Sequence, residues 1–147
     1  MKTLIIILII SAFLQTTIFP IDLVLLILIC RAYIRPAKSN LYLAFGFGLL
    51  VSHLGLTQMG LTSSIYLVVI ELTQMLSRWR LAGNPLMIIP ISFVFLSVST
   101  LASSGINFVG VDLLKLAIAA AISLPVFYLI RLWEERFIVR KEIKLKI

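Results

Sequence analysis

Charged residues are scarce in this 147-residue chain. They make up 13% of it, whereas soluble domains carry about 25% charged residues. Hydrophobic residues make up 61%, and a chain of this length cannot bury so much apolar surface in a water-soluble core. The shortage of charge therefore excludes an ordinary soluble domain. It predicts an integral membrane protein, for which lipid is the solvent.

Cysteine and histidine are almost missing as well, since Cys30 and His53 are the sole residues of their types. A single cysteine excludes an intrachain disulfide, and one residue of each type excludes a zinc site of the usual Cys/His kind. The sequence has no glycine-rich phosphate loop, and its basic residues form no face with interleaved aromatic side chains. We therefore predict no metal, no cofactor and no nucleic-acid partner.

Long apolar runs dominate the rest of the sequence. Six of them are candidate membrane-spanning helices, at residues 3–19, 21–34, 41–56, 61–79, 86–103 and 113–133. The third contains several glycines and polar residues, so it is either a complete span or a broken or re-entrant segment. The pattern predicts an all-α, compact six-helix transmembrane bundle over residues 1–133. A basic cytoplasmic tail over residues 134–147 follows it.

The basic residues test this number of spans. All Lys and Arg residues except Lys115 fall at the start of the chain, after the second span, after the fourth, or around the end of the sixth. With six spans and a cytoplasmic N-terminus, these positions share one side of the membrane, as the positive-inside rule requires. We therefore predict a multi-pass protein with both termini in the cytoplasm. The first span is expected to remain as an uncleaved signal-anchor, because no small-x-small cleavage site precedes Pro20.

Small residues predict where the helices approach each other, because helix association in lipid depends on close packing and polar contacts. The third span carries a row with four-residue spacing, Ala44, Gly48 and Ser52. The sixth span carries a similar row that begins with Ala117 and Ala121. We therefore expect the third and sixth spans to lie at the centre of the bundle.

The last two spans and the segment after them have distinctive sequences. Pro90 and Pro125 fall inside the fifth and sixth spans and are expected to bend them. The tail over residues 134–147 alternates basic and apolar residues. It suits either an amphipathic helix on anionic headgroups or a solvated extension of the sixth helix.

Polar residues inside the spans are candidate functional residues, because charge is costly in lipid. Glu71 is the one carboxylate well inside a span, and Arg31 of the second span lies at a similar depth. A functional carboxylate, a structural ion pair with Arg31 and a protonated, hydrogen-bonded Glu71 are all open interpretations. Asp22 stands at the outer start of the second span, where the positive end of the helix dipole stabilises a carboxylate.

His53 together with Ser63 or Ser64 invites a serine-hydrolase interpretation. However, no orienting acid adjoins His53, and the sequence around the two serines fits no nucleophile elbow. Thr62 or Ser63 is instead expected to cap the fourth helix. The sequence therefore predicts no catalytic centre.

Three pieces of sequence follow one another between residues 20 and 69. Pro20-Ile21-Asp22 opens the second span, Phe45-Gly46-Phe47-Gly48-Leu49-Leu50 lies in the third, and Gly60-Leu61 precedes the fourth. With the chain length, the number of spans and the basic tail, they resemble the MreD family of rod-shape-determining proteins.

The resemblance implies a non-enzymatic scaffold of the bacterial elongation machinery, which acts in peptidoglycan synthesis and cell-shape control. Such a scaffold sits in the cytoplasmic membrane and binds the single-span protein MreC. Through MreC it supports the RodA glycosyltransferase, a penicillin-binding transpeptidase and MreB filaments. The resemblance also implies a fold similar to the six-helix substrate-binding components of energy-coupling-factor transporters, with membrane lipid as a further partner.

That similarity leaves an alternative function, the substrate-binding membrane component of a vitamin or small-molecule transporter. The alternative predicts polar groups that converge in the outer half of the bundle, from Asp22, Gln58, Asn107 and Lys115. It also predicts small-residue grooves for a transport module, whereas the first span is nearly all branched aliphatic residues. The scaffold is therefore the preferred hypothesis.

Overall fold

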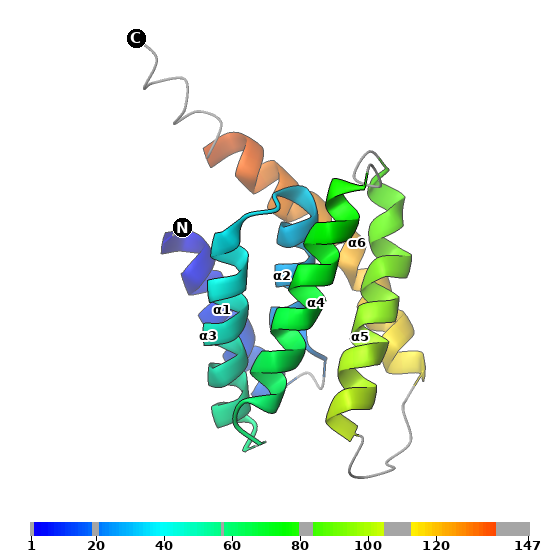
Figure 1. The fold of residues 1–147 in the computed structure, drawn as a ribbon. Coiled ribbons are helices and arrows are strands. Elements are labelled where there is room, and N and C mark those ends of the chain that lie inside the picture. The colour runs from blue at the N-terminus through cyan, green and yellow to red at the C-terminus, as the bar shows by residue number, and fades with distance from the viewer. Residues whose placement is uncertain (1, 19–20, 57, 80–83, 105–112, 138–147) are drawn as a thin grey trace.

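The residues described by the computed structural model are 2–18, 21–56, 58–79, 84–104 and 113–137, and they fold into a helical bundle without strands (Figure 1). The helices are α1 Lys2–Thr17, α2 Leu23–Ile34, α3 Lys38–Leu54, α4 Leu61–Arg78, the short 3-10 helix η2 Pro85–Met87, α5 Ile88–Ser104 and α6 Leu113–Phe137. The predicted all-α class is confirmed. Each predicted span coincides with one α-helix to within a few residues.

Successive α-helices run in opposite directions, so their termini gather at two ends of the bundle (Figure 1). One end holds the starts of α1, α3 and α5 and the ends of α2, α4 and α6. We call it the basic end, because it carries almost all the Lys and Arg residues of the described chain: Lys2, Arg31, Arg35, Lys38, Arg78, Arg131 and Arg136. The opposite end holds the starts of α2, α4 and α6.

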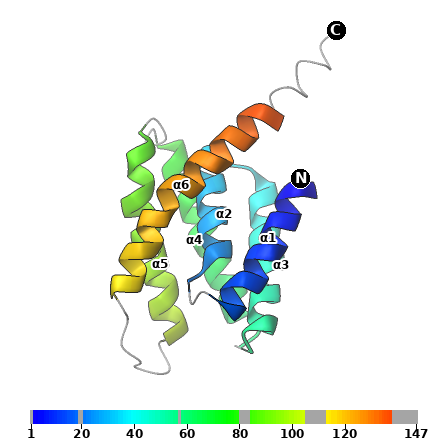
Figure 2. The same cartoon turned by 180° about the vertical axis from the view of Figure 1, so that it is seen from behind.

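Helix α2 lies at the centre of the bundle. It contacts all the other α-helices, and its side chains from Val24 to Tyr33 are buried apart from the partly buried Ile27. A helix that is apolar on every side can bury every side. The prediction that the third and sixth spans are central is therefore wrong. Helix α6 instead crosses diagonally over α2 and α5 on one side of the bundle (Figure 2).

Helix α3 is continuous over Lys38–Leu54, which excludes a broken third segment. The connection to α4 uses left-handed backbone at Leu56, with φ of 51°, and at Gly60, with φ of 96°. Glycine adopts that conformation without strain. Helix α4 begins directly after Gly60, and no side chain caps it. The predicted cap by Thr62 or Ser63 is therefore wrong, because both residues already lie in the first turn.

The two prolines have different positions in their helices. Pro90 lies in the first turn of α5, where a missing N–H breaks no helical hydrogen bond, so the predicted bend has no cause there. Pro125 lies inside α6. Helix α6 continues past Trp133 to Phe137, so the first four residues of the predicted tail extend the sixth helix. Residues 138–147 lie outside the described residues.

Apolar side chains cover much of the outside of the bundle. On α1 they include Ile6, which is 55% exposed, and Phe13, which is 54% exposed. Within the described chain, α6 is long and apolar enough to cross a membrane, over Leu113–Arg136. Helices α1 and α2 and the Ile88–Ala102 part of α5 are apolar but shorter.

Candidate functional site

A buried ion pair joins α2 to α6 near the basic end. The Nε atom of Arg31 lies 3.6 Å from Oε1 of Glu134, and the two side chains are only 5% and 9% exposed. Arg31 comes from the last turn of the central helix, and Glu134 from the last turns of α6. The interpretation in which Glu71 forms an ion pair with Arg31 is therefore wrong, since Arg31 pairs with Glu134 and Glu71 is exposed. Sequence reasoning assigned Glu134 to the tail and missed it, because only the length of α6 brings it to Arg31.

Glu71 lies on the exposed face of α4. Its neighbours on that face are apolar: Val68 is 57% exposed, Leu72 is 44% exposed and Met75 is 52% exposed. The opposite face of α4, which includes Tyr66, Ile70 and Gln74, is buried in the bundle. No residue of the described chain forms an ion pair or hydrogen bond with Glu71. The structure therefore presents this carboxylate outward, within an apolar surface.

A polar cluster lies at the end of the bundle opposite the basic end. We define it as Gln15, Asp22, Tyr66 and Ser99, which come from α1, the residue before α2, α4 and α5. Ser99 Oγ donates to Asp22 Oδ2 at 3.4 Å, and the backbone N–H of Val24 donates to Gln15 Oε1 at 3.1 Å. Asp22 thus stands directly before α2, but its side chain forms no cap.

Tyr66 completes this polar cluster. Its side chain is fully buried, and it lies beside Gln15 and within electrostatic reach of Asp22. Its hydroxyl lies beside the Gln15 side chain but makes no hydrogen bond of normal geometry in the described chain. Sequence reasoning singled out Asp22 but missed Gln15, Tyr66 and Ser99. Nothing in the local sequence shows that α1, α4 and α5 bring them together.

His53 and Gln58 lie in and after the last turn of α3, with exposed side chains. The backbone carbonyl of Gln58 accepts a hydrogen bond from Ser52 Oγ at 2.9 Å, which fixes this connection. Ser63 is buried, whereas Ser64 donates to the Gly60 carbonyl oxygen at 2.8 Å. The structure therefore does not bring His53 and these serines together as a hydrolase would require.

The small-residue row of α3 faces the interior of the bundle. Ala44, Gly48 and Ser52 are all buried. Gly48 marks the closest approach to α4, because a Cβ atom added there would lie 2.6 Å from the Cα atom of Ser63. Only a residue without a side chain permits this backbone separation.

The predicted small-residue row of α6 faces outward instead. Ala117 and Ala121 are exposed, whereas Ala119, Ala120 and Ser123 are buried or nearly so. The expectation that the Ala117–Ala121 row packs inside the bundle is therefore wrong. The buried face of α6 instead includes Leu116, Ala119, Ala120 and Ser123.

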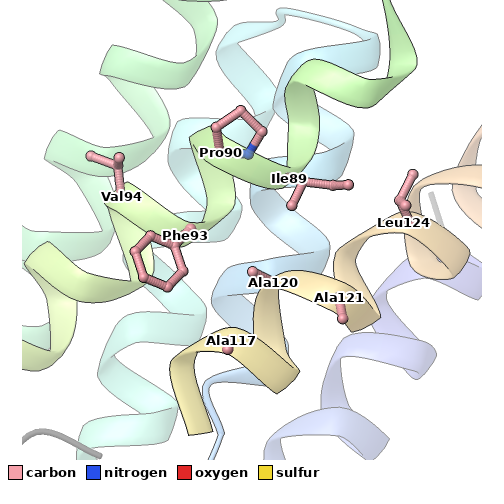
Figure 3. A pocket seen from close by; sticks show the side chains of 8 residues that line it. All are labelled: Ile89, Pro90, Phe93, Val94, Ala117, Ala120, Ala121 and Leu124. Atoms are coloured by element: carbon pink, nitrogen blue, oxygen red, sulfur yellow. The ribbon is translucent and has the colours of Figure 1, made fainter. Parts of the chain in front are cut away.

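Ala117 and Ala121 instead line an open apolar groove of about 500 Å³ between α5 and α6 (Figure 3). Its other lining residues are Ile89, Pro90, Phe93, Val94, Ala120 and Leu124. No charged side chain lines it. The groove can therefore accept an apolar chain, but its own residues offer nothing that selects a polar ligand.

The remaining predicted polar residues do not form a site. Lys115 has an exposed side chain near the start of α6, and Asn107 lies outside the described residues. Within the described chain, no three His, Cys, Asp or Glu residues lie close enough to share a metal ion. The chemistry available is therefore that of the Arg31–Glu134 pair, the outward Glu71 and the polar cluster.

No family model, curated protein or solved structure matches this chain. The resemblance to the MreD family and the similarity to transporter components therefore stay predictions from the sequence.

Proposed function

We propose that this chain is a non-enzymatic membrane scaffold of the MreD type. In this proposal it spans the bacterial cytoplasmic membrane six times, with both termini in the cytoplasm and a bundle similar to those of energy-coupling-factor substrate-binding components. It binds a single-span MreC-like protein and thereby supports RodA, a penicillin-binding transpeptidase and MreB in cell elongation. The observation that carries the proposal is the outward position of Glu71 on an otherwise apolar helix face.

The distribution of apolar and basic residues supports the membrane location. Exposed aliphatic side chains on the outside of the bundle suit lipid, whereas in water they would form a large apolar surface that promotes aggregation. The basic end gathers seven Lys and Arg residues of the described chain, and a positive-inside orientation puts that end in the cytoplasm. Helix α2, with 12 residues, is short for a span, but the other helices surround it. Its length therefore need not match the bilayer.

The depth of Glu71 supports a protein partner. It lies ten residues after Leu61 and seven before Arg78, which places it about 15 Å and about 10 Å from the two ends of α4. In a hydrocarbon core about 30 Å thick, a carboxylate at that depth cannot reach water easily. Lipid tails offer it no hydrogen-bond donor, and exposing it there is costly. A neighbouring helix with a Lys, Arg, amide or hydroxyl group at the same depth removes that cost.

The surroundings of Glu71 suit the side of such a helix. A shallow apolar pocket of about 230 Å³ lies nearer the basic end, lined by Leu72, Met75, Leu76, Trp79 and Phe95. Transmembrane helices associate through close packing combined with a few polar contacts. The Glu71 face, defined as Val68, Glu71, Leu72 and Met75 with this pocket, offers both. It fits one partner helix better than it fits a loose lipid shell.

The transporter alternative receives less support. It requires polar groups that converge around one ligand in the outer half of the bundle. Gln58 and Lys115 have exposed side chains, and the polar side chain that Asp22 contacts, Ser99, is not one of the four predicted groups. We therefore retain the scaffold alone as the proposed function.

The test is co-purification from membranes. The full chain, tagged, is co-expressed with the single-span MreC-like protein of the same genome and extracted in mild detergent. Because losing one member of a buried polar pair costs several kcal/mol, Glu71→Gln is expected to lower the retained partner at least about tenfold. Glu135→Gln, which neutralises an exposed carboxylate outside the span, is the matched control and should retain the partner.

Two outcomes contradict the proposal. One is a wild-type chain that retains no single-span partner. The other is a chain that retains a vitamin tightly through extraction, which is the behaviour of a transporter component. Thermal unfolding of both variants in detergent shows whether any loss reflects misfolding instead of a lost contact.

A further inference from the structure

The polar cluster of Gln15, Asp22, Tyr66 and Ser99 is not used by the proposed scaffold function. It lies at the end of the bundle opposite the basic end and joins α1, α2, α4 and α5. Its four members offer a carboxylate, an amide and two hydroxyl groups. Such a group of hard oxygen donors is uncommon inside an apolar bundle.

The charge of this cluster is unbalanced. Asp22 forms no ion pair with a Lys, Arg or His of the described chain, and Ser99 Oγ donates to its carboxylate at a long 3.4 Å. Tyr66 is the other titratable group that faces it among the described residues. Helix α1 contributes the neutral Gln15, and α5 contributes the neutral Ser99. A carboxylate in this setting requires a positive charge, because low-dielectric surroundings disfavour an isolated ion.

The hydroxyl of Tyr66 is a second sign that the cluster needs a bound group. It is fully buried beside the Gln15 side chain and near Asp22, but no group of the described chain meets it at normal hydrogen-bond geometry. Buried hydroxyl groups normally find a partner, and an orphaned one calls for a group that the fold itself does not supply. A phenolic oxygen can coordinate a hard cation or accept from a protonated carboxyl.

We propose that the polar cluster binds one small monovalent cation, Na⁺ or H⁺, between the Asp22 carboxylate and the Tyr66 hydroxyl. One carboxylate balances one positive charge, so a divalent cation would leave the cluster with an excess of charge. Asp22 is only partly buried, which gives the cation access from the end of the bundle opposite the basic end. This inference rests on the cluster and is independent of the scaffold function.

The predicted consequence is cation-dependent stability. A cation that binds the folded chain stabilises it by mass action, so the melting temperature should rise with its concentration. The full chain in detergent is titrated with NaCl at pH 9 against N-methyl-D-glucamine chloride of equal ionic strength. A second titration lowers the pH from 9 to 5 without Na⁺. At about 100 times the dissociation constant, we expect a rise of at least about 5 °C in one arm.

The arm that responds identifies the cation, and variants locate it. Asp22→Asn should abolish the response, and Tyr66→Phe should shift it to a higher Na⁺ concentration or a lower pH. Ser99→Ala, which removes the donor to Asp22, should also shift the midpoint. Ser97→Ala on the same helix and Glu135→Gln at the basic end are the matched controls and should respond like wild type.

The proposal is overturned if wild type responds to neither Na⁺ nor pH, a result that needs no variant. It is equally overturned if Asp22→Asn folds and titrates like wild type, because the cation then acts elsewhere. If Asp22→Asn does not fold, unchanged midpoints in both Tyr66→Phe and Ser99→Ala overturn it.

Discussion

Arg31 and Glu134 form an ion pair across the interface between the central helix α2 and the last turns of α6, with 3.6 Å between Nε and Oε1. Both side chains are almost fully buried. The pair therefore ties the end of the longest helix to the centre of the bundle. A second pair on α6, Arg131 and Glu135, has a shorter distance of 3.0 Å but is half exposed. Comparing the two pairs therefore shows whether burial or a short distance decides how much an ion pair contributes to stability.

Breaking the buried pair should destabilise the bundle far more than breaking the exposed one. Removing one member leaves an uncompensated buried charge, so Glu134→Gln should lower the free energy of unfolding by about 3–5 kcal/mol. Glu135→Gln should cost less than about 1 kcal/mol, because water screens that pair. Denaturant unfolding in detergent measures both. Equal losses in the two variants would show that Glu134 is not buried against Arg31.

Gly48 should be the glycine of α3 that tolerates no side chain. A Cβ atom at position 48 meets the backbone of Ser63, so Gly48→Ala must push α3 and α4 apart and should cost about 1–3 kcal/mol. Gly46 is the control on the same helix, since a Cβ atom there meets nothing within 4 Å. Gly46→Ala should be neutral or stabilise by up to about 1 kcal/mol, because alanine favours a helix. Melting temperatures in detergent compare the two, and a larger loss at position 46 would refute this packing.

Adjacent alanines of α6 should differ in how much enlargement destabilises the bundle. Ala120 is only 4% exposed, so Ala120→Leu should overpack the interior and cost about 1–3 kcal/mol. Ala121 has an exposed side chain on the groove between α5 and α6, so Ala121→Leu should change the stability little. The same melting assay decides. A larger loss for Ala121→Leu than for Ala120→Leu would contradict this packing and support the Ala117–Ala121 row as the buried face.

The positions of the helices could be predicted from the sequence, because six long apolar runs separated by polar connections leave few alternatives. Gly48 could also be recognised as a candidate for close approach, since small residues at four-residue spacing share one helix face. The central place of α2 could not be predicted. Its aliphatic run from Leu23 to Ile29 has no polar side, and such a helix looks the same whether it faces lipid or other helices.

The polar contacts were the least predictable part. Arg31 and Glu71 have similar expected depths, but depth says nothing about the direction in which a side chain points around its helix. Glu134 reaches Arg31 only because α6 continues past Trp133. The polar cluster around Asp22 likewise depends on how four separate elements meet, and the local sequence carries no signal of that meeting.

Reporter fusions at three points test the six-span account most directly. Green fluorescent protein and alkaline phosphatase are fused after Ala37, after Gln58 and at the C-terminus of the full chain. Fluorescence without phosphatase activity is predicted at Ala37 and at the C-terminus, because Ala37 and the end of α6 lie at the basic end. Phosphatase activity without fluorescence is predicted at Gln58. Phosphatase activity at the C-terminus, or the same reporter active at Ala37 and Gln58, would contradict a six-span bundle with its basic end in the cytoplasm.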